Sequence, residues 1–196
     1  MGKNDIKSGK KTLTPAVFLD RDGTVIFDRN YLSSPDRVKL YVYSADSIKK
    51  LRKAGFKIIV VTNQSGISRG MFTESELKKV NARFVSLLKR QGAKIDRLYY
   101  CPHIDDDKCD CRKPKTGMVL RAAKEHGIDL QKSYAVGDSV RDYLLGNNAG
   151  GKGVMVLTGH GKRQFKKIKD QKTKPLAVCK TLKDAVKFII NDSKKS

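Results

Sequence analysis

The sequence predicts an open, doubly wound α/β fold, in which helices cover both faces of a parallel sheet. Short apolar runs that are typical of buried strands alternate along the chain with segments of helical periodicity. The runs are rich in Val, Ile and Leu, as expected of strands that are covered on both faces. Several of them end on Asp or Thr, and the carboxyl ends of such strands are where these sheets gather their functional groups.

The first elements follow from apolar patterning. The run at 16–20 (AVFLD) is a short strand that ends on an acid, and the β-branched run at 57–62 (KIIVVT) is a second strand. Between them, residues 44–54 are predicted to form a helix, because Ile48 and Leu51 fall on one face of it.

Capping signals define the next helices. Thr73 and Glu76 have the spacing of a capping box, so a helix is predicted to begin there. A short strand follows at 98–101, and then a helix at 116–126 that Gly127 ends. The remaining elements are strands at 133–138, 153–158 and 176–179 and helices at 139–149 and 181–190. Residues 159–174 are predicted to be a basic loop.

Length and charge limit the classes of protein to consider. A chain of 196 residues suits one domain, which we place at 14–196 behind a basic extension at 1–13. The formal net charge of +22 excludes an acidic solubilising protein and favours an anionic partner. More than half of the excess charge lies in residues 1–13 and 162–196. The partner could be a nucleic acid, a membrane surface or an anionic substrate.

The sequence favours a cytoplasmic protein. No stretch reaches about 18 apolar residues, so no transmembrane helix is predicted, and the first residues lack the apolar core of a signal peptide. In the cytoplasm the four cysteines are not expected to form disulfides. Cys179 is interpreted as a buried strand residue, and His126 and His160 as surface residues without evident partners.

Two carboxylates follow the first strand. Asp20 and Asp22, with Gly23 allowing a sharp turn, could share one small site in which one attacks and the other handles a proton. Paired carboxylates also suit Mg²⁺, and Asp138 at a later strand end would complete its ligands. The alternative is a merely polar strand–loop junction. Asp142 could be a further ligand, an anchor behind the ligands or a surface acid paired with Arg141, and we favour the anchor.

Two other segments fit a phosphoryl group. The Thr62 hydroxyl and nearby backbone N–H groups could hold a phosphoryl oxygen, although a Thr-Asn pair at this place often only caps a helix. Lys113 suits the charge of a transferring phosphoryl group, and Arg112 suits a bidentate clamp on a second anion. A solvated basic loop is the alternative reading of this Arg-Lys pair.

A separate cluster has metal-ligand spacing. Cys101, His103, Cys109 and Cys111 form the pattern C-x-H-x5-C-x-C, with three thiolates and one imidazole. Such a closed set of four ligands suits structural Zn²⁺ and leaves no open position for a substrate. We therefore interpret it as a loop staple.

The ordered motifs FLDRDGTV, TNQSGISRG, CRKP and VGDSVRD resemble those of the haloacid dehalogenase superfamily of aspartate-nucleophile phosphatases. The zinc loop, CPH followed by CDCRKP, looks like the branch of heptose-1,7-bisphosphate 7-phosphatases and histidinol-phosphate phosphatases. The segments TNQSGISRG and DRNY are more similar to those of the heptose enzymes, which supply lipopolysaccharide precursors. The resemblance covers about residues 16–158 and implies a Rossmann-like haloacid dehalogenase fold without a large cap domain.

The resemblance also implies roles for individual residues. Asp20 would be the nucleophile that forms an aspartyl phosphate, and Asp22 the acid and then the base. Thr62 and Lys113 would stabilise the phosphoryl group. The implied Mg²⁺ ligands are Asp20, the backbone carbonyl of Asp22 and Asp138. The implied substrate contacts are Asp28, Arg29, Asn30, Tyr31, Asn63, Gln64, Ser65, Arg112 and Ser139. The enzyme would act as a monomer on a small sugar bisphosphate, with no membrane partner and only weak electrostatic binding of nucleic acid.

Other functions stay open from the sequence. Polynucleotide 3′-phosphatases share stretches similar to TNQSGISRG and RKPKTGM, and the charge of +22 fits a nucleic-acid substrate, but a zinc loop is not expected in them. Histidinol phosphate also fits the spacing of the zinc loop. A basic zinc-containing module that binds nucleic acid is the non-enzyme alternative. The absence of Trp and the 7% of aromatic residues leave little for bases to stack on in such a module.

Overall fold

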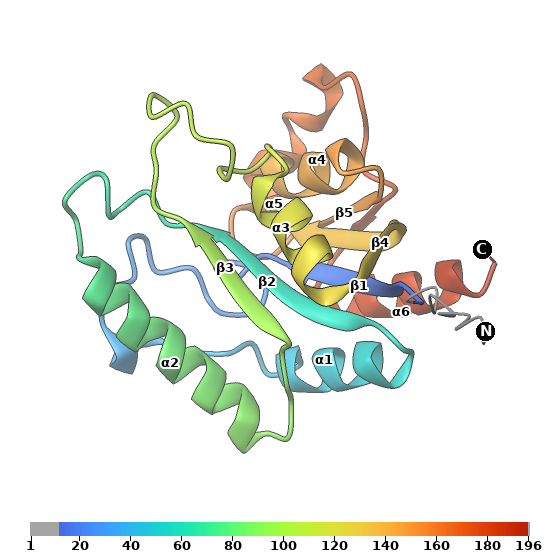
Figure 1. The fold of residues 1–196 in the computed structure, drawn as a ribbon, viewed down its shortest axis with the longest axis horizontal. Helices are drawn as coiled ribbons and strands as arrows, with labels where there is room; N and C mark the ends of the chain where they lie inside the picture. Colours follow the sequence, from blue (N-terminus) through green and yellow to red (C-terminus); the bar gives the residue numbers. More distant parts are fainter. Residues whose placement is uncertain (1–11, 196) are drawn as a thin grey trace, which may run out of the picture.

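The computed structural model describes residues 12–195 as a six-stranded parallel sheet between two layers of helices (Figure 1). Most of the basic extension at 1–13 therefore lies outside the described residues. The strand order is β3-β2-β1-β4-β5-β6, and every neighbouring pair is parallel. The strands are β1 (Thr14–Leu19), β2 (Lys57–Asn63), β3 (Arg97–Cys101), β4 (Ile128–Gly137), β5 (Lys152–Val156) and β6 (Ala177–Cys179). The predicted doubly wound fold is confirmed.

The main helices are α1 (Ser44–Lys53), α2 (Glu74–Arg90), α3 (Gly117–His126), α4 (Val140–Asn148) and α6 (Leu182–Ser193). The expectation of a plain loop at 159–174 is wrong, because α5 (Gly161–Phe165) and a 3-10 turn (Ile168–Asp170) form there. The Lys174 ammonium closes this turn by donating hydrogen bonds to the carbonyls of Ile168, Lys169 and Gln171, at 2.6–2.9 Å.

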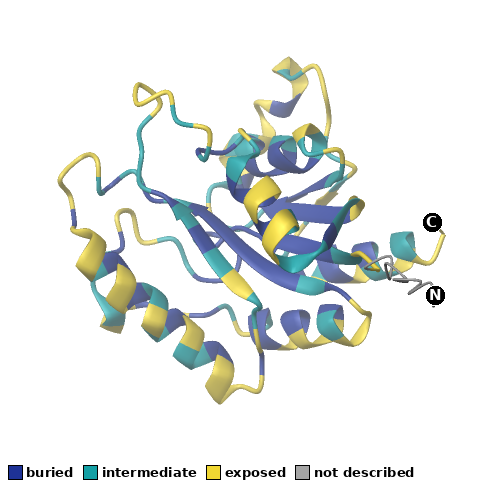
Figure 2. Cartoon of the chain, in the orientation of Figure 1, coloured by how far each residue is buried: buried dark blue, intermediate teal, exposed yellow. Residues whose placement is uncertain are grey.

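Alternate residues of each strand enter different layers of the core. In β1, Val17 and Leu19 pack on the side covered by α1, α2 and α6, whereas Ala16 and Phe18 pack on the side of α3 and α4. Figure 2 shows that the central strands are mostly buried, whereas the edge strand β3 is partly exposed and the helices are exposed mainly on their outer faces. The apolar character of the strand runs is thus explained by cover on both sides.

Two helix ends lie where the capping residues in the sequence predicted them. Thr73 and Glu76 form the predicted capping box, and Gly127 ends α3 in the left-handed conformation with a φ of 62°. By contrast, β4 begins at Ile128, five residues before the predicted strand. This early part of the strand pairs with the start of β1 across a register shift, so it has no apolar run of its own to reveal it.

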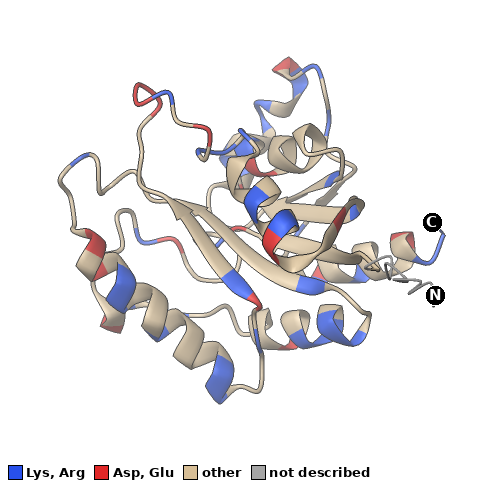
Figure 3. Ribbon diagram, in the orientation of Figure 1, with Lys and Arg blue, Asp and Glu red and all other residues tan. Residues whose placement is uncertain are grey.

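The positive charges lie mainly on the outer faces of the helices and at the end of the chain, while the sheet carries few (Figure 3). No helix within residues 12–195 has the length and apolar character needed to span a membrane. Cys179 lies in β6 as expected but is half-buried. His126 has a partner after all, because its Nε2 lies 3.1 Å from the hydroxyl of Tyr99.

Candidate active site

The site forms where the strand order reverses. β1 and β4 are neighbours, and the chain leaves them toward opposite edges of the sheet. Such a switch point opens a crevice at the carboxyl ends of the strands. Asp20 follows β1 and Asp138 follows β4, so the topology brings these two predicted carboxylates together at the crevice.

Lys113 is the buried cation of the site. Its ammonium donates hydrogen bonds to Asp20 Oδ1 at 2.7 Å and to the carbonyl of Val61 at 2.9 Å, and it lies 2.6 Å from Asp142 Oδ1. All three charged side chains are nearly inaccessible to solvent. A buried charge is tolerated only where it is paired in this way. Asn63 fixes the backbone of Lys113 in place through both its amide oxygen and its amide nitrogen.

The three buried acids of the site, Asp20, Asp138 and Asp142, outnumber its buried cation, Lys113. Burial, partly offset by Lys113 and reinforced by Asp142, raises the pKa of Asp20 to about 7. Burial and the charges of Asp20 and Asp142 raise the pKa of Asp138 to about 8. One carboxylate oxygen from each of these three acids lies within 4.8 Å of the others. An oxygen-lined site whose charges repel each other fits a hard divalent cation such as Mg²⁺.

Asp142 has a second set of contacts that fits the supporting position expected of it. It accepts a hydrogen bond from the backbone N–H of Ser139 at 2.9 Å, in the capping box that begins α4. Its carboxylate also fills the space beside Gly137, where a Cβ atom would come within 2.2 Å of it. Asp142 therefore joins the start of α4 to Lys113.

The Asp22 carboxylate occupies a different place from the acid cluster. It accepts hydrogen bonds from Gln64 Nε2 at 2.9 Å and from the Thr62 hydroxyl at 3.4 Å, and it is paired with Arg21 at 3.0 Å. Gln64 also donates to Thr62 at 2.8 Å. Asp22 keeps some exposure to the crevice and can meet a ligand there, while Thr62 is buried beneath it.

Two adjoining cavities open over these groups. One, of about 190 Å³, is lined by the acid cluster, Lys113, Thr62 and Ser139. The other, of about 230 Å³, is lined by Asn30, Tyr31, Gln64 and Ser65. Three residues face both cavities, namely Asp22, Asp28 and Asn63. The structure thus brings together most of the predicted site residues, but Arg29 and Arg112 are not among the residues that line either cavity.

Arg112 is turned toward the zinc loop. Its Nε donates to Asp105 Oδ1 at 2.8 Å, and its Nη1 donates to the carbonyl of His103 at 2.9 Å. The other oxygen of Asp105 accepts from Arg141 at 3.0 Å. Arg141 lines the cavity of the acid cluster. Asp105 therefore links the guanidinium groups of Arg112 and Arg141 at the edge of this cavity.

His160 lies near the surface, as expected, but it belongs to the site, so the expectation that it has no partner is wrong. Its backbone N–H donates to Asp138 Oδ2 at 2.6 Å, and its Nε2 lies 2.8 Å from Asp28 Oδ2. The turn before it packs so closely that Gly23 and Gly159 tolerate no side chain, since a Cβ atom on either would come within about 2.2 Å of Asp138. His160 follows β5, so the rule that strand ends carry function could have found it.

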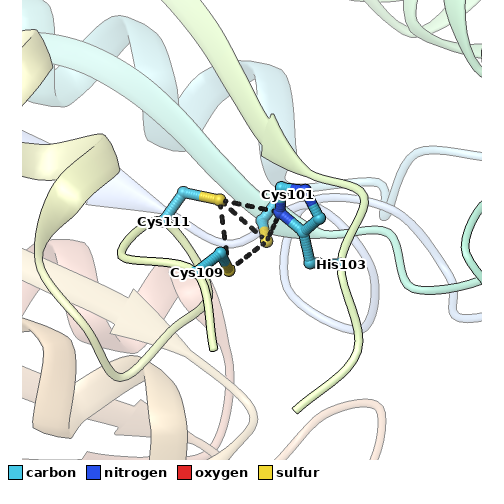
Figure 4. A group of neighbouring side chains, drawn as sticks. All are labelled: Cys101, His103, Cys109 and Cys111. Atoms are coloured by element: carbon cyan, nitrogen blue, oxygen red, sulfur yellow. Dashed lines mark hydrogen bonds between the residues drawn. The ribbon is translucent and has the colours of Figure 1, made fainter. Parts of the chain in front are cut away.

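The four predicted zinc ligands converge as Figure 4 shows. Their sulfur atoms lie 3.0–3.7 Å apart, and His103 Nδ1 lies 3.3 Å from Cys111 Sγ and 3.6 Å from Cys101 Sγ. Tetrahedral Zn²⁺ with bonds of about 2.3 Å holds sulfur ligands about 3.8 Å apart, so the set fits this ion. Cys101 ends β3, and the other ligands lie in the loop that leads to Lys113.

The sequence reasoning missed three side chains at or behind the site. Arg21 and Asn81 contact the Asp22 side of the crevice, and Arg141 lines the other side. Arg21 could have been suspected from its position between two predicted catalytic acids. Asn81 lies in the middle of α2, and no local pattern distinguishes it.

Comparisons with known proteins agree with this geometry. A family model described as HAD-hydrolase-like matches residues 110–185. The D-glycero-beta-D-manno-heptose-1,7-bisphosphate 7-phosphatase of Helicobacter pylori strain J99 is 39% identical over 75% of this chain and 85% of that protein. The protein of the same name from Pasteurella multocida is 42% identical over 74% of this chain and 82% of its own length.

A solved structure has the same architecture over nearly its whole length. It is the D,D-heptose 1,7-bisphosphate phosphatase of B. bronchiseptica, in complex with magnesium and phosphate, at 32% identity and a TM-score of 0.81. The match covers 91% of this chain and 99% of that one. Motifs, fold and full-length relatives thus agree, and this chain belongs to the haloacid dehalogenase-like phosphatases, in the family of the heptose-1,7-bisphosphate 7-phosphatases.

Proposed function

We propose that this protein is a Mg²⁺-dependent phosphomonoesterase that removes the 7-phosphate of D-glycero-D-manno-heptose 1,7-bisphosphate. The observation that carries the proposal is the contact between Asp20 and Lys113 beneath a cavity lined with acids, beside the separately held carboxylate of Asp22. The Asp20 carboxylate can attack a phosphoryl group in this cavity, while the ammonium of Lys113 stabilises the negative charge of that group. The heptose substrate is inferred from the names of the similar enzymes.

In the first step, an oxygen of Asp20 attacks the phosphorus atom. The bond from phosphorus to the sugar oxygen breaks, its electron pair stays on that oxygen, and protonated Asp22 donates the proton that releases the alcohol. Lys113 and Thr62 would bind phosphoryl oxygens during the transfer, where the negative charge is spread over them. Asp20 is then an acyl phosphate.

In the second step, water attacks the same phosphorus atom. Asp22, now a carboxylate, accepts the proton of the water, the bond from phosphorus to Asp20 breaks, and inorganic phosphate leaves. The enzyme returns to its starting state with Asp22 protonated again. Asp20, Asp138 and the backbone of Asp22 would hold Mg²⁺, which supplies positive charge to the phosphoryl group in both steps.

The sugar and its other phosphate would lie over the second cavity and its edge. Asp28, Asn30, Tyr31 and Ser65 present polar groups to this space. Arg141, which lines the first cavity, and Arg112, which Asp105 joins to it, would bind the second phosphate at the edge of that cavity. Arg29, Asn63, Gln64 and Ser139 complete the proposed substrate contacts.

We further propose that the Cys/His cluster holds a structural Zn²⁺ and that the enzyme works as a monomer in the cytoplasm. All four cysteines are free thiols, which suits a reducing compartment. Residues 14–196 would act as one domain. The charged surface would adsorb nucleic acid only weakly and with strong dependence on salt.

The test compares three phosphomonoesters in the presence of Mg²⁺: the heptose bisphosphate, histidinol phosphate and a 3′-phosphorylated oligonucleotide. We expect kcat/KM to be at least about a hundredfold higher for the heptose bisphosphate. Asp20→Asn should abolish phosphate release and leave the protein folded, because Lys113 keeps Asp142 as an acidic partner. A higher kcat/KM for either other substrate would reject the proposed substrate, and turnover by Asp20→Asn would reject the nucleophile.

A further inference from the structure

Arg21 is a completely buried arginine between the two proposed catalytic acids. A guanidinium removed from water has to find partners for its N–H groups within the protein. Its Nε lies 3.1 Å from Asp22 Oδ2, and its Nη2 lies 3.3 Å from Asp22 Oδ1 and 3.0 Å from Oδ2. Its Nη1 donates to Asn81 Oδ1 at 2.5 Å. The side chain is thus built into the structure as a fork that grips one carboxylate.

This grip determines how Asp22 is oriented. Gln64 and Thr62 each contact only Asp22 Oδ2, whereas Arg21 contacts both carboxylate oxygens. Two bonds to a planar fork fix the rotation of the carboxylate, which a single bond does not. A general acid has to lie within hydrogen-bond reach of the departing oxygen, so this rotation matters for the reaction.

Asn81 fixes the fork in turn. It lies on α2, sixty positions along the chain from Arg21, and its neutral amide oxygen accepts a hydrogen bond from Nη1, the guanidinium nitrogen that does not contact Asp22. An acid at position 81 would compete with Asp22 for the guanidinium, and an apolar side chain would leave Nη1 without an acceptor. α2 begins directly after the segment that lines the larger cavity, so the contact also ties Asp22 to that wall.

We propose that Arg21 and Asn81 are positioning residues of the proton transfer: Asn81 orients Arg21, and Arg21 orients the Asp22 carboxylate toward the leaving-group oxygen. The proposal rests on the acid–base role proposed for Asp22. It makes a prediction that a purely structural role does not. A sugar alkoxide needs the proton of Asp22 to depart, whereas p-nitrophenolate departs without one.

The test measures kcat/KM of Asn81→Ala with the heptose bisphosphate and with p-nitrophenyl phosphate, because kcat/KM reports the steps up to departure of the alcohol. We expect a loss of at least about tenfold for the sugar substrate and of less than about threefold for the aryl ester. Arg21→Lys, which keeps the charge but not the fork, should behave in the same way. Ser86→Ala, on the same helix, should change neither value.

Further variants separate failure of this inference from failure of the proposed function. Among the variants, Asp22→Asn should have the largest difference between its kcat/KM losses on the two substrates. The double variant that adds Asn81→Ala should have the same difference. Equal losses for both substrates in Asn81→Ala, or no loss for either, would overturn the positioning role. If Asp22→Asn itself had no such difference, the proposed role of Asp22 would fail instead. Asn81→Ala keeps the test decisive if Arg21→Lys does not fold.

Discussion

The ammonium of Lys113 lies 2.7 Å from the carboxylate of Asp20, although 93 positions separate them in the chain. Asp142 lies 2.6 Å from the same ammonium, so one buried cation serves two buried acids. Both acids line the cavity, but Asp142 also accepts a hydrogen bond from the backbone N–H of Ser139 in the capping box of α4, whereas Asp20 lies at the end of β1. Asp142 can therefore hold Lys113 while Asp20 carries out its proposed reaction.

Asp142→Asn is expected to lower both activity and stability. The variant removes one of the two charge-assisted contacts of Lys113 and leaves Asp20 as its acidic partner, so we expect a loss of about 1.5–3 kcal/mol of stability. We expect kcat to fall by at least about tenfold, because Lys113 would be drawn more strongly to Asp20. Steady-state kinetics and urea unfolding measure the two effects.

Asp184→Asn is the matched control for this variant. Asp184 occupies the corresponding place in the capping box of α6, away from the acid cluster. It should lose about 1 kcal/mol of stability and keep its kcat. If both variants lost activity equally, the contact between Asp142 and Lys113 would have no special role.

The zinc cluster should be needed for the order of the loop that carries Lys113. We expect metal analysis to find one Zn²⁺ per chain and Cys109→Ser to lose it, with a melting temperature lower by at least about 5 °C. Cys179→Ser, which changes a cysteine outside the cluster, should keep its zinc. A zinc-free wild-type protein of full stability would contradict the staple.

Arg112→Ala should impair a bisphosphate more than a monophosphate. Asp105 and the carbonyl of His103 orient the guanidinium of Arg112. The variant removes this guanidinium and, with it, the proposed contact with the phosphate that is not cleaved. We expect kcat/KM to fall by about tenfold to a hundredfold for the heptose bisphosphate, and much less for the monophosphate. Asp105→Ala should have a smaller effect of the same kind, and Asp106→Ala none. Equal losses on both substrates would remove Arg112 from this role.

The stability of the protein should fall below about pH 4 partly through Asp192. Hydrogen bonds from Lys152 at 2.7 Å and from the Tyr134 hydroxyl at 2.6 Å lower the pKa of this carboxyl group. A lowered pKa stabilises the fold above the pKa of the unfolded chain, and this contribution disappears as the pH falls through the folded value.

Asp192→Asn measures this contribution. Its free energy of unfolding should be lower than that of the wild type by about 1 kcal/mol at pH 7, since the contact is partly solvated. The difference between the two proteins should shrink steadily below pH 4. A difference that is constant from pH 7 to pH 2 would show that the charge of Asp192 contributes nothing.

Features that depend on neighbouring residues were predictable without the fold. The capping box of Thr73 and Glu76 satisfies its own backbone groups, so its local pattern suffices to place the start of α2. The four residues of the Cys/His cluster lie within eleven positions of each other, and their spacing indicates that they could share one metal ion. Asp20 and Asp138 were expected to meet, because parallel strands bring their carboxyl ends to one edge of the sheet.

The sequence by itself thus determined the fold class, the acids at the strand ends and the cysteine cluster. Only the tertiary structure decided which polar side chains meet: Lys113 with Asp20 and Asp142, Arg21 with Asn81, and His160 with Asp28. Periodicity records which face of an element avoids water, but the choice of a partner depends on how distant elements pack. Arg21 illustrates the limit, because arginine is mostly exposed in proteins and here it is completely buried.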